Sequence, residues 1–81
     1  MKHILEHLVK AIVDNPDKVV IDEFSDNGIM HLTISVDASD MGKVIGKEGK
    51  VIRSIRNVMK IPAIKRHERI EISIQEQEAT Q

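Results

Sequence analysis

The sequence predicts a small α+β domain in which helices cover one face of a three-stranded mixed sheet. Three observations lead to this fold class: an amphipathic helical pattern near the start, a hairpin signal, and two further helical patterns followed by one alternating strand. The expected order is α-β-β-α-α-β. The chain of 81 residues is long enough for one domain with a modest core. We expect that domain over residues 1–76 and a frayed tail over residues 77–81.

Apolar residues recur at helical spacing over residues 2–14 and form one face of an amphipathic helix. Pro16 is expected to stop this helix, because the residue before a proline disfavours the helical conformation. The apolar positions are Ile4, Leu5, Leu8, Val9, Ile12 and Val13.

Two strands joined by Asn27-Gly28 are expected next, over residues 18–25 and 30–36. Asn-Gly is a strong hairpin signal, since a type I′ turn needs a positive φ at both central residues. The turn fixes a register that leaves one face apolar and the other mostly polar. The expected pairs include Asp26 with Ile29, Phe24 with His31, Ile21 with Ile34, and Val19 with Val36.

Two helices and a last strand complete the order. The first helix covers residues 38–45, with Asp37 or Ser39 as its N-cap. The second runs to about Lys60, because Pro62 is expected to end it. The last strand, over residues 69–75, lies parallel to the central strand. The buried stripe expected for the second helix consists of Val51, Ile52, Ile55, Val58 and Met59.

Composition excludes several classes of protein. The chain has no cysteine, which excludes disulfides and cysteine-ligated zinc. No apolar run approaches the roughly 18 residues of a membrane span. Glu6 interrupts the stretch where a secretory signal needs an apolar core, so we expect a cytoplasmic protein with no membrane partner. A single phenylalanine, without tyrosine or tryptophan, argues against base stacking on an aromatic sheet.

The net charge of −1 hides a strong asymmetry along the chain. Residues 1–40 carry three basic and eight acidic side chains, whereas residues 41–70 carry nine basic and two acidic ones. A segment with this excess of positive charge attracts anions.

The segment Gly46-Lys47-Glu48-Gly49 joins the two central helices. Its glycines allow positive φ and close approach to a ligand, and the following helix N-terminus favours an anion. A Walker P-loop would need Ser or Thr where Glu48 stands, and a dinucleotide fingerprint would need glycine at Val44. The spacing does fit the GxxG loop of a KH domain, which clamps about four nucleotides of a single strand.

With this loop between two helices, after a hairpin and before a strand, the chain resembles the KhpA (YlqC) family of small stand-alone bacterial KH proteins. The resemblance covers essentially the whole chain and is most specific over residues 40–49. It implies a type II KH fold, single-stranded RNA binding with low sequence specificity, and a role as post-transcriptional regulator or RNA chaperone. It also implies pairing with itself or with a Jag/EloR-type KH protein. Glu48 departs from the commonest family pattern, and its carboxylate repels phosphate.

The resemblance places the RNA site on the loop and its surroundings. Arg69 is expected on the rim of the groove, whereas Arg56 and Lys60 are expected to point away from it. The groove floor falls on Val44, Ile45, Ile52 and Ile72. The RNA-binding residues are Lys43, Val44, Ile45, Gly46, Lys47, Glu48, Gly49, Lys50, Arg53, Lys65 and Arg66.

The chain has more apolar residues near Pro62 than a helix needs to cover a three-stranded sheet, so some of them are expected to be exposed. We therefore expect a two-fold homodimer, with Phe24 on the open sheet face as the other outward candidate. The alternative is that Ile61 and Ile64 fold under the following loop and complete the monomer core. The expected interface consists of Val58, Met59, Ile61 and Ile64.

We expect no catalysis, no cofactor and no small-molecule substrate. His3 and His7 are one helical turn apart but have no third ligand, so no metal is expected. Asp37 and Asp40 are interpreted as helix caps. The alternative function is a protein–protein interaction module with a weak or vestigial RNA site.

Overall fold

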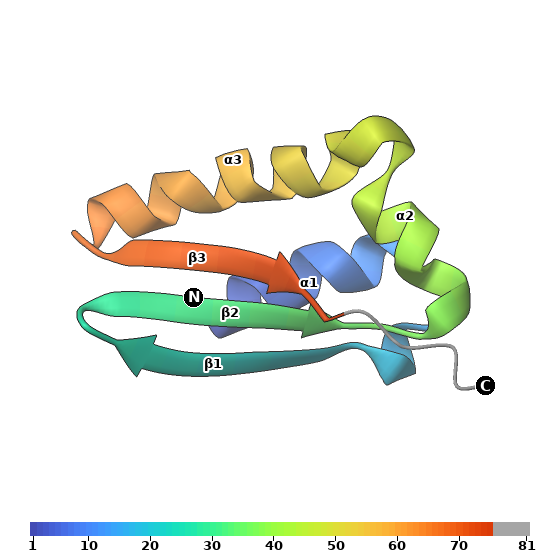
Figure 1. Ribbon diagram of the computed structural model, residues 1–81, viewed down its shortest axis with the longest axis horizontal. Helices are drawn as coiled ribbons and strands as arrows, with labels where there is room; N and C mark the ends of the chain where they lie inside the picture. The colour runs from blue at the N-terminus through green and yellow to red at the C-terminus, as the bar shows by residue number, and fades with distance from the viewer. Residues whose placement is uncertain (76–81) are drawn as a thin grey trace.

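The computed structural model describes residues 1–75, and its elements follow the expected order (Figure 1). The tail expected over residues 77–81 lies outside the described residues. The helices are α1 (Lys2–Ile12), α2 (Met41–Ile45) and α3 (Lys50–Lys65), and the strands are β1 (Val20–Asp26), β2 (Ile29–Ser35) and β3 (Arg69–Ile74). Short 3₁₀ turns stand between them at η1 (Pro16–Lys18), η2 (Ala38–Asp40) and η3 (Lys47–Gly49).

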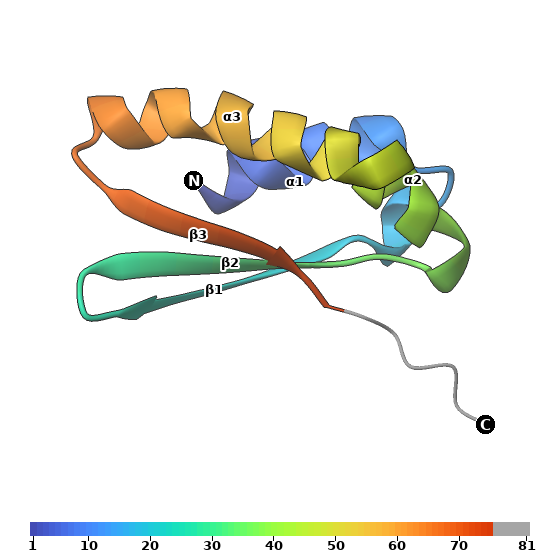
Figure 2. The same cartoon turned by 45° about the horizontal axis from the view of Figure 1, so that its top comes forward.

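The sheet has the strand order β1-β2-β3, with β2 antiparallel to β1 and parallel to β3. All three α-helices lie on one face of this sheet (Figure 2). A parallel pair needs a crossover connection, which α2 and α3 supply between β2 and β3. The α+β fold class and the order α-β-β-α-α-β predicted from the sequence are confirmed.

The hairpin between β1 and β2 has the predicted register. Ile21 faces Ile34, and the ladder closes with Asp26 opposite Ile29. Both turn residues have positive φ, 53° at Asn27 and 78° at Gly28, as a type I′ turn requires. The ladder ends one pair before the expected partners Val19 and Val36, although both of these side chains are buried.

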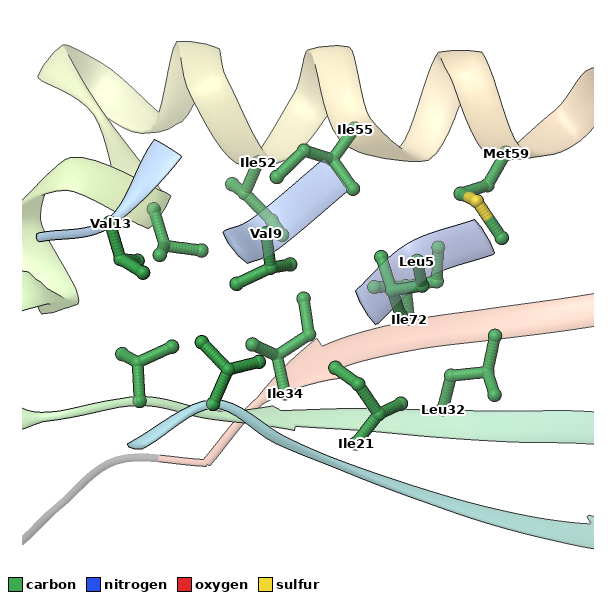
Figure 3. Packing of buried hydrophobic residues seen from close by; sticks show 13 residues of the cluster. Leu5, Val9, Val13, Ile21, Leu32, Ile34, Ile52, Ile55, Met59 and Ile72 are labelled. Atoms are coloured by element: carbon green, nitrogen blue, oxygen red, sulfur yellow. The ribbon is translucent and has the colours of Figure 1, made fainter. Parts of the chain in front are cut away.

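The core lies between the helices and the inner face of the sheet (Figure 3). Each strand contributes alternate residues to it, because successive side chains point to opposite faces. The helices contribute one stripe each, and α1 buries Leu5 and Val9 completely. The strands contribute Ile21, Leu32, Ile34 and Ile72 to the core, and Val19 and Val36 join it from the positions next to β1 and β2.

The helix α3 continues past Pro62 to Lys65, so its expected end near Lys60 is wrong. Proline removes one helical hydrogen bond, but Ala63 is buried one turn after Met59 and keeps the last turn packed on the core. The N–H of Arg66 still donates to the carbonyl of Pro62 at 3.1 Å. The buried stripe is therefore Ile52, Ile55, Met59 and Ala63, whereas Val51 is half-buried and Val58 is exposed.

Of the two expected caps before α2, the structure uses Asp37. Its side chain accepts a hydrogen bond from the backbone N–H of Ser39 at 3.1 Å and begins the turn η2. Asp40 occupies the position before α2 but makes no capping hydrogen bond, so the interpretation of its side chain as a cap is wrong. Its carboxylate lies against the end of α1 instead.

Candidate nucleic-acid interface

The loop between α2 and α3 is a tight connection at one end of both helices (Figure 1). The N–H of Gly46 closes α2 on the carbonyl of Gly42 at 2.8 Å, and the N–H of Gly49 returns to the carbonyl of Gly46 at 3.2 Å. α3 starts immediately afterwards at Lys50. The backbone donors of its first turn therefore follow the loop directly, which is where an anion is favoured.

The two loop glycines are needed for different reasons. A Cβ at Gly46 would overlap the Val51 side chain and lie 2.8 Å from the Val51 backbone nitrogen. Gly49 has space around it but adopts φ 74°, a left-handed conformation that a Cβ disfavours. Glu48 between them adopts φ 58° despite its side chain.

Four of the predicted RNA-binding cations lie around this loop, and they differ in the partners that their side chains have within the protein. Lys47 and Lys50 are exposed. Arg53 is exposed but its Nη2 donates to the backbone carbonyl of Glu48 at 2.7 Å. Lys43 turns toward the end of α1, where its Nζ lies 2.8 Å from the Asp14 carboxylate. That hydrogen bond and the charge of Asp14 raise the pKa of Lys43.

The apolar residues expected on the groove floor are mostly core residues. Val44 is completely buried, and Ile52 and Ile72 are nearly so. Ile45 is 37% exposed and presents apolar surface beside the loop. The floor near the loop is therefore made mainly by Ile45.

A cleft of about 400 Å³ lies between α3 and β3, lined by Arg56, Lys60, Ile70, Glu71 and Ile72. Arg56 donates from Nε and Nη2 to the carbonyl of Ile72, at 3.2 and 3.1 Å. The expectation that Arg56 and Lys60 point away from the groove is therefore wrong. Arg56 stands four residues after Ile52 and three before Met59, so it flanks the buried stripe, and this spacing could have revealed it.

Lys65 and Arg66 are exposed at the other end of α3. A helix rises about 1.5 Å per residue, so Lys65 lies about 22 Å along the axis from Lys50. The predicted cations are therefore spread over the length of α3 and are not all clustered at the loop. Arg69, expected on the rim, is exposed at the start of β3 beside this far end.

The residues expected at a dimer interface divide into two groups. Met59 is completely buried in the core, so the prediction that it lies in an interface is wrong. Val58, Ile61 and Ile64 are 47%, 60% and 70% exposed on α3. They recur every three residues and lie along one side of the helix. Ile61 and Ile64 do not complete the core of this chain.

Within residues 1–75, no three side chains of His, Asp or Glu come together in a way that could hold a metal ion. No helix in the described part of the chain is both long and apolar enough to cross a membrane.

Along the chain the elements are a helix, two strands, two helices joined by the Gly46–Gly49 loop, and a last strand parallel to β2. This order and pairing define a type II KH domain. The chain belongs to the KhpA/KhpB KH-domain family, whose model matches residues 2–74.

Curated relatives of similar length support this assignment. The RNA-binding protein KhpA of Halalkalibacterium halodurans is 40% identical over 74 residues, which cover 91% of this chain and 97% of the relative. The protein of the same name from Clostridium acetobutylicum is also 40% identical, over 91% of this chain and 99% of its own. That of Chlamydia pneumoniae is 35% identical over 95% of this chain and 99% of its own.

Proposed function

We propose that this protein binds single-stranded RNA through the loop Gly46-Lys47-Glu48-Gly49, with low sequence specificity. The observation that carries the proposal is the loop itself, a glycine-bounded turn that leads into the first turn of α3 between two exposed lysines. Backbone donors and lysine charges recognise phosphate without reading bases. The relatives are named as RNA-binding proteins.

The RNA runs from the loop along the cleft between α3 and β3. Lys47 and Lys50 bind phosphate at the loop, and Ile45 contacts the first base. Lys65 and Arg66 attract the strand at the far end of α3. An extended single strand of about four nucleotides spans such a groove, whereas a duplex is too wide for it. We place this activity in the cytoplasm, as that of a post-transcriptional regulator or RNA chaperone without a catalytic step.

The double variant Lys47→Asp/Glu48→Asp tests the loop. It should abolish binding of a fluorescent single-stranded RNA, because two acidic side chains repel the phosphate. It should also keep the fold, since Asp tolerates the positive φ of residue 48 better than most residues. Lys2→Asp, in α1, makes the same change in net charge away from the loop and should keep binding. Binding by the double variant as tight as that of the parent would refute the clamp.

We further propose that the protein pairs through α3, as a homodimer or with a Jag/EloR-type KH protein. The exposed side chains of Val58, Ile61 and Ile64 favour this second function. A small domain also gains stability by covering such residues. If RNA binding fails while pairing holds, the protein is an interaction module with a vestigial KH loop.

A further inference from the structure

Arg53 was expected to contact RNA phosphate, but its guanidinium already has a partner within the protein. Its Nη2 donates to the backbone carbonyl of Glu48 at 2.7 Å, from the first turns of α3 back to the loop. The same peptide group is held on its other side, because the N–H of Gly49 donates to the carbonyl of Gly46 at 3.2 Å. The Glu48–Gly49 peptide is therefore held at both its oxygen and its nitrogen.

Glu48 needs such support because of its backbone conformation. Its φ and ψ are 58° and 27°, in the left-handed region. Residues with a Cβ populate this region roughly tenfold less readily than the right-handed one. The loop glycines at positions 46 and 49 do not carry this cost. An unsupported Glu48 would leave the loop in several conformations, and ordering them on binding would lower the affinity.

We infer that Arg53 is a positioning residue, which holds the loop in its binding conformation through the Glu48 carbonyl and does not itself bind phosphate. This inference rests on the proposed function, in which the loop is the RNA clamp. A charged donor makes the stronger kind of hydrogen bond to a carbonyl. Glu48 is the residue that adopts the left-handed conformation with a Cβ, and Arg53 is the side chain that donates to its carbonyl.

The salt dependence of RNA binding separates positioning from phosphate contact. Arg53→Met should weaken binding of a short single-stranded RNA about fivefold to tenfold, because the roughly tenfold preference of Glu48 for right-handed backbone is then no longer offset. The slope of log K against log salt should stay that of the parent. Lys50→Met, the matched control, should reduce that slope by about 0.7, as expected for one lost phosphate contact on a single strand.

Two changes at residue 48 separate backbone strain from side-chain charge. Glu48→Gly removes the strain, so adding Arg53→Met to it should change affinity less than about twofold. Glu48→Gln removes the charge and keeps the strain, so the fivefold to tenfold loss should persist there. An equal loss in all three backgrounds, or a slope reduced by about 0.7 in Arg53→Met, would refute the inference.

A measurement without RNA keeps the inference separate from the proposed function. Amide order parameters of Glu48 and Gly49 should fall from about 0.85 to about 0.6 in Arg53→Met and stay high in Lys50→Met. Unchanged order parameters would contradict the positioning role. If the parent binds no RNA, the proposed function fails, and the order parameters alone decide whether Arg53 holds the loop.

Discussion

The buried carboxylate of Asp40 binds Asn15 twice. Its Oδ2 accepts hydrogen bonds from the side-chain nitrogen and the backbone N–H of Asn15, both at 3.0 Å. Its Oδ1 accepts from the backbone N–H of Asp14 at 3.3 Å. These bonds join the end of α1 to the start of α2, 25 residues apart in the sequence. The helix α2, which leads into the Gly46–Gly49 loop, is thus anchored to the end of α1.

This anchor predicts a loss of stability in acid. Burial raises the pKa of Asp40, but the hydrogen bonds from Asn15 and Asp14 outweigh it and hold the pKa below its ordinary value of 3.8. The unfolded chain therefore takes up this proton first as the pH falls. The contribution of Asp40 to the free energy of unfolding is fully present above the pKa of Asp40 in the unfolded chain. It is lost as the pH falls from about 4 through the pKa in the folded chain.

The variant Asp40→Asn should therefore lower the melting temperature by several degrees at pH 7. As the pH falls below about 4, the difference from the parent should shrink, because protonation of Asp40 in the unfolded chain then favours unfolding of the parent. Urea unfolding at pH 7, 5, 4 and 3 measures both curves. A constant difference between parent and variant over this range would contradict the linkage.

Two glycines of the same segment should respond oppositely to alanine. Gly46→Ala should destabilise the protein by roughly 2 kcal/mol or more, since it adds overlap with Val51 and strain at φ 78°. Gly42→Ala meets nothing within 4 Å and lies in α2, so it should be neutral or stabilise by up to about 1 kcal/mol. Urea midpoints give both values, and similar losses in the two variants would rule out this loop geometry.

The salt dependence of RNA binding should depend more on the exposed Lys47 than on Lys43, which is paired with Asp14. With roughly three or four phosphate contacts, log K should fall with log salt at a slope of about −2 to −3. Lys47→Met should reduce the slope by about 0.7, whereas Lys43→Met should change it less, because Asp14 holds the Lys43 ammonium at 2.8 Å. Titrations at four salt concentrations test this, and a flat dependence in the parent would exclude a phosphate-binding surface.

The exposed side of α3 predicts a homodimer that one charge disrupts. Ile61→Lys should change the mass by light scattering from about two chains to one, because a buried lysine at the interface is costly. The helical signal should persist, since Ile61 is 60% exposed in the single chain. Phe24→Lys, at an exposed apolar residue on the open face of the sheet, should leave the dimer intact. A parent that is monomeric at tens of micromolar would contradict the interface.

Local signals were enough to predict most of the fold. The Asn27-Gly28 turn fixed the hairpin register, because its length and positive φ values permit one pairing. The loop glycines were equally informative, since few other residues adopt their conformation. These features depend on residues adjacent in the sequence, and this is why they could be identified there.

Features set by tertiary contacts were harder to predict. Asp40 looked like a cap because the sequence does not show that residues 14 and 15 lie beside it. Arg56 looked solvated because its acceptor, the carbonyl of Ile72, lies 16 residues away. Lys43 and Arg53 looked like phosphate ligands, although each has a partner within the protein. Charge and spacing predict a basic surface, but they do not show which of its cations already have a partner within the protein.

The end of α3 offers a last test, because there a local rule gave the wrong boundary. Pro62 lies inside the helix and leaves the carbonyl of Val58 without its usual donor. Pro62→Ala should therefore raise the free energy of unfolding by about 1–2 kcal/mol, after allowing for the more flexible unfolded chain. Asn57→Ala, in the middle of α3, should gain only about 0.5 kcal/mol from helix propensity. Urea midpoints at constant m-value compare the two, and a gain for Pro62→Ala no larger than that for Asn57→Ala would mean that the helix stops before Pro62 in solution.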